Sequence, residues 1–146
     1  MSSSKRKFLI GVIISLVILL IILIFKDNIS EPQTCIVVRK FYFNTELGNY
    51  EEAIELISSD SKKGSAKSEM INTLKKGSED MKSRGGISKL KLNEVFENVD
   101  SAMVHVTIIY NGTEDDVRNK YLIQKSDSIG LVKENGKWVI YLKPLY

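Results

Sequence analysis

The chain has 146 residues, with 21 Lys and Arg against 18 Asp and Glu, and a formal net charge of +3. Four of the basic residues, Lys5, Arg6, Lys7 and Lys26, fall in a leading stretch that holds no acid, so residues 27–146 carry 17 basic and 18 acidic residues. This nearly neutral part is long enough for one domain. Its charge balance excludes general nucleic-acid binding, which needs an excess of Lys and Arg.

An uninterrupted apolar run covers residues 8–25 and contains no charged side chain. As a helix it would reach about 27 Å, close to the hydrocarbon thickness of a bilayer, so it predicts a transmembrane helix whose partner is lipid. A secretory signal has a shorter apolar core and a small-residue cleavage site, whereas Lys26, Asp27 and Asn28 follow this run. A buried core helix is a second alternative, but the run has no polar face. We expect an uncleaved signal anchor.

The charges around the apolar run orient it. Residues 1–7 hold three basic side chains and no acid, and the positive-inside rule puts such a segment in the cytoplasm. We therefore predict a single-pass cell-membrane protein. Its parts are a cytoplasmic tail (1–7), a transmembrane helix (8–25), a linker (26–33) and an extracytoplasmic domain (34–146).

Cys35 is the only cysteine, so no disulfide can form within the chain. Bacterial lipoproteins carry a lipidated Cys straight after a short apolar run, but Cys35 comes ten positions after the end of this one. We expect a buried thiol on a helix. A disulfide to another chain is the alternative.

The first half of the domain has apolar residues at helical spacing. The pattern predicts three helical segments, over about residues 32–46, 50–57 and 65–83. Gly48 ends the first segment and Gly85-Gly86 ends the third, because glycine accepts the left-handed conformation that closes a helix. Asn49 and Glu52 have the spacing of a capping box at the start of the second segment, and a serine-rich run breaks that segment.

The second half changes to a period of two, which predicts strands. About four antiparallel strands are expected, in residues 89–96, 102–110 and 118–126 and in the hairpin 131–142. The adjacent apolar residues Val95 and Phe96 suggest a β-bulge, and Asn135-Gly136 predicts a tight hairpin turn. Three helices followed by four strands predict an α+β domain with the helices on one face of a curved sheet.

Charge is distributed unevenly along the domain. Residues 62–91 hold nine Lys and Arg against three acids, whereas residues 94–116 hold six acids and no Lys or Arg. The simplest interpretation is a solvated helix face and solvated hairpins. The alternative is a dipolar surface that orients a partner or faces anionic headgroups.

Three short motifs occur in a fixed order: VRKFY at residues 38–42, GNYEEA at 48–53 and VKENGKWVI at 132–140. They resemble the opening and the last hairpin of the nuclear transport factor two-like superfamily, and Gly85-Gly86-Ile87 resembles its small bacterial lipoprotein-type branch of unknown function. The resemblance covers about residues 34–143. It implies a cystatin-like cone, with helices packed against a strongly bent sheet and a pocket between them. Here a membrane-spanning helix stands where many of those relatives carry a lipidated Cys.

Enzymes of that superfamily, such as ketosteroid isomerase, need a buried carboxylate base or a His–Asp pair, with a donor for the oxyanion. His105, the only histidine, falls on the strand face opposite Val104 and Val106, and Asp100 and Asp116 flank that strand at its loop ends. The sequence contains no metal-ligand spacing, nucleophile motif or phosphate-binding loop. We expect no catalytic residue, no metal and no cofactor.

Aromatic residues are numerous in the domain, and most must lie in the core of so small a fold. Phe41, Tyr121 and Trp138 are the candidates for lining the pocket that the resemblance implies. As pocket residues they would contact a small apolar ligand.

These observations predict a non-enzymatic, membrane-anchored binding protein whose domain lies outside the cytoplasm. Its partner would be another envelope protein, a second copy of the chain or a small apolar ligand. One alternative is an assembly component of a secretion or conjugation machine, and another is a membrane-held immunity or superinfection-exclusion factor. A small-molecule isomerase or hydrolase is a further alternative.

Overall fold

The computed structural model describes residues 31–112 and 124–142. The chain divides between Glu31 and Pro32 into two units, and every element below belongs to the second unit. The expected transmembrane helix 8–25 lies outside the described residues and stays a prediction. Among the residues described, no helix is both long and apolar enough to cross a membrane.

Four helices form the first half of the domain: α2 (Gln33–Leu47), α3 (Tyr50–Glu55), α4 (Ser59–Lys62) and α5 (Lys67–Ser83). The three predicted helices are present, and α4 is an additional single turn within the serine-rich run. Gly48 closes α2 with a φ of 86°, as predicted. The predicted capping box was wrong, because the Asn49 side chain makes no capping hydrogen bond to α3.

Four strands follow: β1 (Ile87–Glu97), β2 (Ser101–Tyr110), β3 (Gln124–Glu134) and β4 (Lys137–Tyr141). They form one antiparallel sheet in the order β1-β2-β3-β4. The predicted bulge is present, since the pairing of β1 with β2 shifts between Glu94 and Phe96. The predicted turn is present too: Asn135 and Gly136 both have positive φ between β3 and β4.

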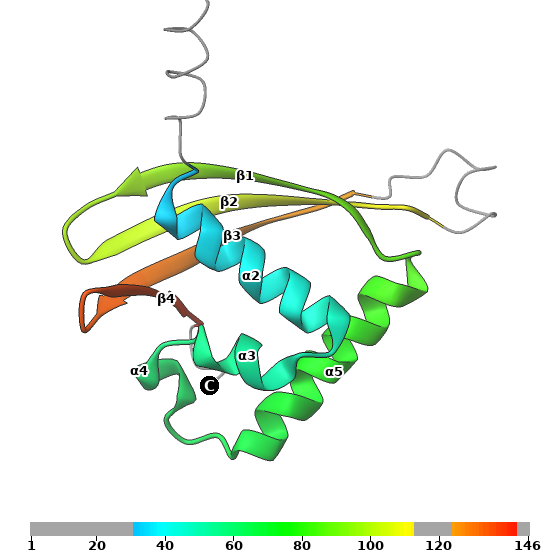
Figure 1. The fold of residues 1–146 in the computed structure, drawn as a ribbon, viewed down its shortest axis with the longest axis horizontal. Coiled ribbons are helices and arrows are strands. Elements are labelled where there is room, and N and C mark those ends of the chain that lie inside the picture. The colour runs from blue at the N-terminus through cyan, green and yellow to red at the C-terminus, as the bar shows by residue number, and fades with distance from the viewer. Residues whose placement is uncertain (1–30, 113–123, 143–146) are drawn as a thin grey trace, which may run out of the picture. The chain divides into compact units, whose positions relative to one another are not determined.

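The helices lie on one face of the sheet, and the main core fills the space between them (Figure 1). Strand β2 supplies every second residue to this core: Ala102, Val104, Val106, Ile108 and Tyr110. Cys35 and Val38 of α2 pack against them, together with Leu131 of β3 and Ile140 of β4. The expectation of a buried Cys35 on a helix is confirmed. The other face of β2 is turned toward solvent. The sheet therefore needs the helices to cover its apolar face.

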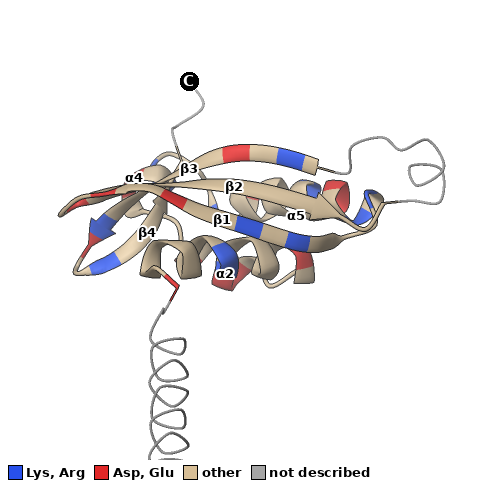
Figure 2. Ribbon diagram, turned by 90° about the horizontal axis from the view of Figure 1, so that it is seen from above, with Lys and Arg blue, Asp and Glu red and all other residues tan. Residues whose placement is uncertain are grey.

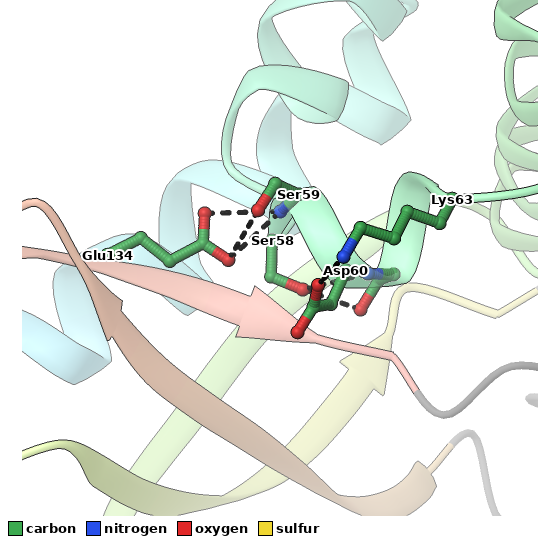
Figure 3. A network of polar contacts seen from close by, with 6 residues as sticks. Ser58, Ser59, Asp60, Lys63 and Glu134 are labelled. Atoms are coloured by element: carbon green, nitrogen blue, oxygen red, sulfur yellow. Dashed lines mark hydrogen bonds and ion pairs between the residues drawn. The ribbon is translucent and has the colours of Figure 1, made fainter.

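The segment that joins α3 to α4 is attached to β4 by backbone hydrogen bonds. The amide of Ile140 donates to the carbonyl of Leu56 at 2.7 Å, and the amide of Ser58 donates to the carbonyl of Ile140 at 2.8 Å. Glu134 accepts hydrogen bonds from the amide and hydroxyl of Ser59 at 3.0 Å (Figure 3). A carboxylate here satisfies a donor at the first turn of α4. These contacts join residues 75 or more positions apart, so periodicity could not reveal them.

Gly85 lies where the end of α5 meets the end of β2. Its φ is +84°, and a Cβ placed on it would come within 2.5 Å of the carbonyl oxygen of Gly112. The amide of Gly112 also donates to the carbonyl of Arg84 at 2.9 Å. The backbone of Gly112 therefore occupies the space that any side chain at residue 85 would need.

We predict that Gly85→Ala lowers the free energy of unfolding by roughly 3 kcal/mol, because it adds a backbone clash to the cost of a left-handed conformation. Gly64→Ala is the matched control, since Gly64 has a φ of +86° but no atom within 4 Å of its added Cβ. It should cost only about 1 kcal/mol. Urea denaturation of both variants measures the difference, and equal losses would contradict the steric argument.

Candidate binding surface

Two phenols and a carboxylate come together on the helix-covered face of the sheet. Tyr42 projects from α2 toward Tyr110 of β2 and Asp127 of β3, and Asp127 shares its face with Val106, its register partner. The pKa of Tyr42 is raised to about 12, mainly by burial, with smaller contributions from the nearby Asp127 and Tyr110. The phenol therefore stays protonated at neutral pH and acts as a hydrogen-bonding group rather than a base.

Arg84 completes this end of the domain. Its guanidinium carbon lies 5.7 Å from the centre of the Tyr110 ring, and its Nη2 lies 3.1 Å from Oδ1 of Asp80. Burial raises the pKa of Tyr110, while the charge of Arg84 acts in the opposite direction. The contact between Arg84 and the Tyr110 ring holds the end of α5 against β2.

We predict that Tyr42→Phe changes the alkaline stability of the domain. The pKa of Tyr42 is about 12 in the folded chain against an ordinary 10.0, so between pH 10 and 12 the unfolded chain releases a proton that the folded chain retains. Stability from this group is complete below pH 10 and falls as the pH rises toward 12. The urea midpoint should therefore fall less steeply above pH 10 in Tyr42→Phe than in the wild type. Parallel slopes would contradict the burial of this phenol.

The three aromatic residues proposed to line a pocket have different positions. Phe41 is half-buried on α2, with its ring edge-on to Tyr42 at a centroid distance of 5.7 Å. Trp138 is buried in the main core under Lys133, whose Nζ lies 4.9 Å from the ring centre. Tyr121 lies outside the described residues. Phe41 and Trp138 thus pack in the same core, and their role toward a ligand stays a prediction.

The polar residues considered for catalysis are not gathered into one site. His105 is exposed on the face of the sheet away from the helices, with Nδ1 3.4 Å from Oγ of Ser128. Asp100 is exposed in the turn between β1 and β2, and Asp116 lies outside the described residues. A further carboxylate, Asp60 of α4, forms an exposed ion pair with Lys63 at 2.6 Å. Within the described ranges, no group of three or more His, Cys, Asp or Glu could hold a metal ion.

A surface that we did not predict lies at the hairpin between β1 and β2. Val95, Phe96 and Val99, here called the hairpin tip, are 55%, 45% and 80% exposed. The bulge explains part of this exposure. Glu94 pairs with Val104, whereas Phe96 pairs with Met103, so the shift of one residue leaves Phe96 on the outer face of the sheet.

The outer-face row that begins at Phe96 continues across the sheet. Phe96 pairs with Met103, Met103 with Gly130, and Gly130 with Tyr141. Met103 is half-buried, and Tyr141 is exposed. The hairpin tip is therefore the end of an apolar strip rather than an isolated group of side chains.

In the turn between β1 and β2, which carries Val99, one side chain accepts three hydrogen bonds. Oδ1 of Asn98 accepts hydrogen bonds from the amides of Asp100 and Ser101, at 3.1 and 2.9 Å, and from the hydroxyl of Ser101 at 2.9 Å. The amide of Lys133 donates to the carbonyl of Asp100 at 3.0 Å, which ties the turn to β3. An Asx turn of this kind orders a short loop. Val99 is thus presented by a fixed backbone.

We predict that Asn98→Ala loosens this turn without unfolding the domain. It removes an acceptor shared by three donors, and each such bond is worth about 1 kcal/mol. The amides of Asp100 and Ser101 should exchange with deuterium about tenfold faster, while those in the middle of β2 keep their rates. Asn98→Asp is the control, because its carboxylate can accept the same bonds. Unchanged exchange in Asn98→Ala would show that the turn does not depend on this side chain.

Comparisons with known proteins bear on the fold. No family model matches the chain, and no curated protein matches it. A solved structure from Campylobacter jejuni, described as a candidate NTF2-like transpeptidase, has a TM-score of 0.57 and 20% identity, and the match covers 73% of this chain and 95% of that one. NTF2 is nuclear transport factor two, so the likeness supports the expected fold. At this identity it concerns the fold alone, and the narrower resemblance to a lipoprotein-type branch stays a prediction.

Proposed function

We propose that this NTF2-like domain is a membrane-tethered, extracytoplasmic binding module that acts through the hairpin tip rather than by catalysis. The observation that carries the proposal is the tip itself: two exposed apolar side chains at the end of β1 and a third on the turn that Asn98 and β3 hold in place. Apolar side chains presented together on an ordered backbone are typical of interaction sites. The predicted anchor supplies the tether.

The exposure of the tip argues for a partner. Val99 alone is 80% exposed, and it is flanked in the chain by Asn98 and Asp100, which interact well with water. Covering an apolar side chain of this size stabilises a complex by about 1.5 kcal/mol or more. A rigid turn loses little conformational freedom when it binds, so more of this energy is available for affinity.

A binding role is also favoured by where the polar side chains lie. His105 is on the outer face, and Asp100 is in the turn five residues before it, whereas an NTF2-like isomerase or hydrolase needs its base inside the cone. Asp127 is on the helix-covered face, but it is exposed rather than enclosed. Cys35 is 3% exposed in the main core, which is an unsuitable position for a nucleophile. The name of the similar Campylobacter protein is not evidence of transpeptidase activity for this chain.

Fractionation of a bacterial host that expresses the full chain with a C-terminal tag tests the tether. The tagged chain should stay in the membrane pellet after alkaline extraction, and protease added to spheroplasts should remove the tag. Removal of residues 8–25 should release the chain from the membrane. A full-length chain found in the soluble cytosolic fraction would overturn the tether.

The binding role is tested with Val99→Asp in the same host. A charge at the most exposed tip residue should reduce crosslinking of the chain to envelope proteins by about tenfold. Ser88→Asp, an exposed substitution at the other end of β1, should leave crosslinking unchanged. Equal crosslinking of both variants would exclude the tip as the binding element.

A further inference from the structure

Two lysines of β1 project from the outer face of the sheet. Lys89 pairs with Ile109 and Lys91 pairs with Thr107, and both of these partners alternate with the buried residues of β2. Because side chains alternate strictly along a strand, Lys89 and Lys91 point away from the helices. Both are exposed, and Figure 2 shows the blue segments of β1 that contain them.

Hydroxyl groups continue the row that Lys91 begins. Thr107 pairs with Ser126 of β3, and the two hydroxyl oxygens lie 3.2 Å apart. Lys89, Lys91, Thr107 and Ser126 are here called the lysine face. Each of these side chains has a donor that can bind an anionic oxygen.

The acidic residues of the sheet lie elsewhere. Strands β1 to β3 contain Glu94, Glu97, Asp127 and Glu134. Three of them pair with buried residues of β2 and so share the helix-covered face: Glu94 with Val104, Glu97 with Ala102 and Asp127 with Val106. The fourth, Glu134, ends β3, and its carboxylate accepts hydrogen bonds from Ser59. In these strands, which the structure describes in full, no acid therefore lies beside the two lysines on the outer face.

Cations on the helix side have acidic neighbours. Three ion pairs, at 2.6, 2.8 and 3.1 Å, join Lys63 with Asp60, Lys67 with Glu51 and Arg84 with Asp80. On α5, Lys75 and Lys76 precede Glu79 and Asp80 by four residues, the spacing at which opposite charges are neighbours on a helix. Within the residues that the structure describes, neither Lys89 nor Lys91 forms an ion pair. Positive charge without acidic neighbours attracts anionic groups.

The length of the connection to the predicted anchor limits how far the domain can lie from lipid. The apolar run ends at residue 25 and α2 begins at Gln33, so the seven residues 26–32 join them. A chain of this length spans at most about 25 Å. A domain tethered in this way stays near the headgroups. Even a weak attraction then has an effect, because the tether gives a high effective concentration.

We propose that the lysine face rests on the anionic headgroups of the membrane that holds the predicted anchor. Lys89 and Lys91 attract the lipid phosphates, and the hydroxyls of Thr107 and Ser126 donate hydrogen bonds to phosphate oxygens. The contact orients the outer face of the sheet toward lipid and α5 away from it. The proposal rests on the tether in the proposed function, and it adds the surface by which the domain itself meets the membrane.

The expected attraction is small for each lysine and increases with their number. One lysine near an anionic leaflet favours the surface about fivefold, so two favour it about thirtyfold. The attraction weakens with added salt, because charges are screened over about 10 Å at 0.1 M ionic strength. A neutral leaflet does not provide it. Dependence on anionic lipid therefore separates this contact from a contact with a protein.

Fluorescence quenching by lipid tests the contact with the full chain. Gln124→Cys carries a fluorophore on the outer face, since Gln124 is exposed and pairs with Ile109. Cys35 is buried, so the chain without the added cysteine serves as the labelling blank. The labelled chain is reconstituted in vesicles that contain phosphatidylcholine with a nitroxide on its headgroup. The quenched fraction should be about fivefold larger when phosphatidylglycerol is mixed into the phosphatidylcholine.

A label on α5 is the positional control. Ser68→Cys is exposed on that helix, and its quenched fraction should stay low in both kinds of vesicle. Added salt should lower the quenching at residue 124 to the value in phosphatidylcholine alone. Thermal unfolding of each labelled chain confirms that it is folded.

Neutral variants test the two lysines directly. Lys89→Gln with Lys91→Gln should reduce quenching at residue 124 to the value in phosphatidylcholine alone. Lys75→Gln with Lys76→Gln is the matched control, because it removes the same charge from exposed positions on α5 and should leave that quenching unchanged. Equal quenching of the labels at residues 124 and 68, or equal losses in the two double variants, would overturn the proposal. Loss of solvent access at residue 124 without quenching by lipid would also overturn it, since a protein would then cover this face.

Alkaline extraction of the same vesicles separates failure of this proposal from failure of the proposed function. A chain that is extracted has no tether, and the proposed function fails with it. A chain that resists extraction, but whose label at residue 124 is not quenched, keeps the tether and the role of the hairpin tip. Only the contact of the lysine face with lipid is then excluded.

Discussion

The structure depends on the burial of one face of β2 against α2. Strand β2 pairs with β1 on one side and with β3 on the other, and its alternate residues from Ala102 to Tyr110 meet the helix layer. Because side chains alternate strictly along a strand, this single contact also decides what faces solvent. It places His105 on the outer face, away from any enclosed site. The packing that stabilises the domain therefore also decides which polar side chains face solvent and which face the helices.

The bulge in β1 is the second constraint. It acts on a sheet whose inner and outer faces are already decided by the burial of β2. Without the extra residue at position 95, Phe96 would continue the inward alternation of Leu92 and Glu94 and point toward the helices. The shift instead moves it beside Met103 on the outer face. One inserted residue thus converts a candidate core side chain into part of an exposed apolar surface, which is how bulges commonly redirect side chains near functional sites.

The NTF2-like fold does not decide between catalysis and binding, because both occur on the same framework of helices and sheet. What distinguishes this chain lies in the positions of its side chains. Protonated phenols and an arginine occupy one end of the helix-covered face, and the apolar hairpin tip extends from the other end of the sheet.

Local signals were sufficient for most of the elements. Helical and alternating periods located α2, α5, β2 and the β3–β4 hairpin. Asn135-Gly136 marked the hairpin turn because few other pairs accept its backbone, and Gly48 marked a helix end for the same reason. The position of Cys35 within an apolar helix was enough to predict its burial. Each of these features depends on neighbours a few residues away, which is the range that a period or a dipeptide reports.

Only the tertiary structure decided which distant groups meet. The contact of Glu134 with Ser59 joins residues 75 positions apart. The charge of Asp127 acts on the pKa of Tyr42 only because the fold brings this residue of β3 near α2. Phe96 in the hairpin tip lies on the outer face because the register of β1 against β2 shifts. The adjacent Val95 and Phe96 indicated the bulge, but only the pairing of the two strands decided which face Phe96 takes. Such contacts depend on how whole helices and strands pack together. The free energy of burial depends on the surface that two elements bury against each other, and no local sequence pattern reports it. The sequence by itself therefore determined the elements and their inward faces, while packing decided which surfaces remain for a partner.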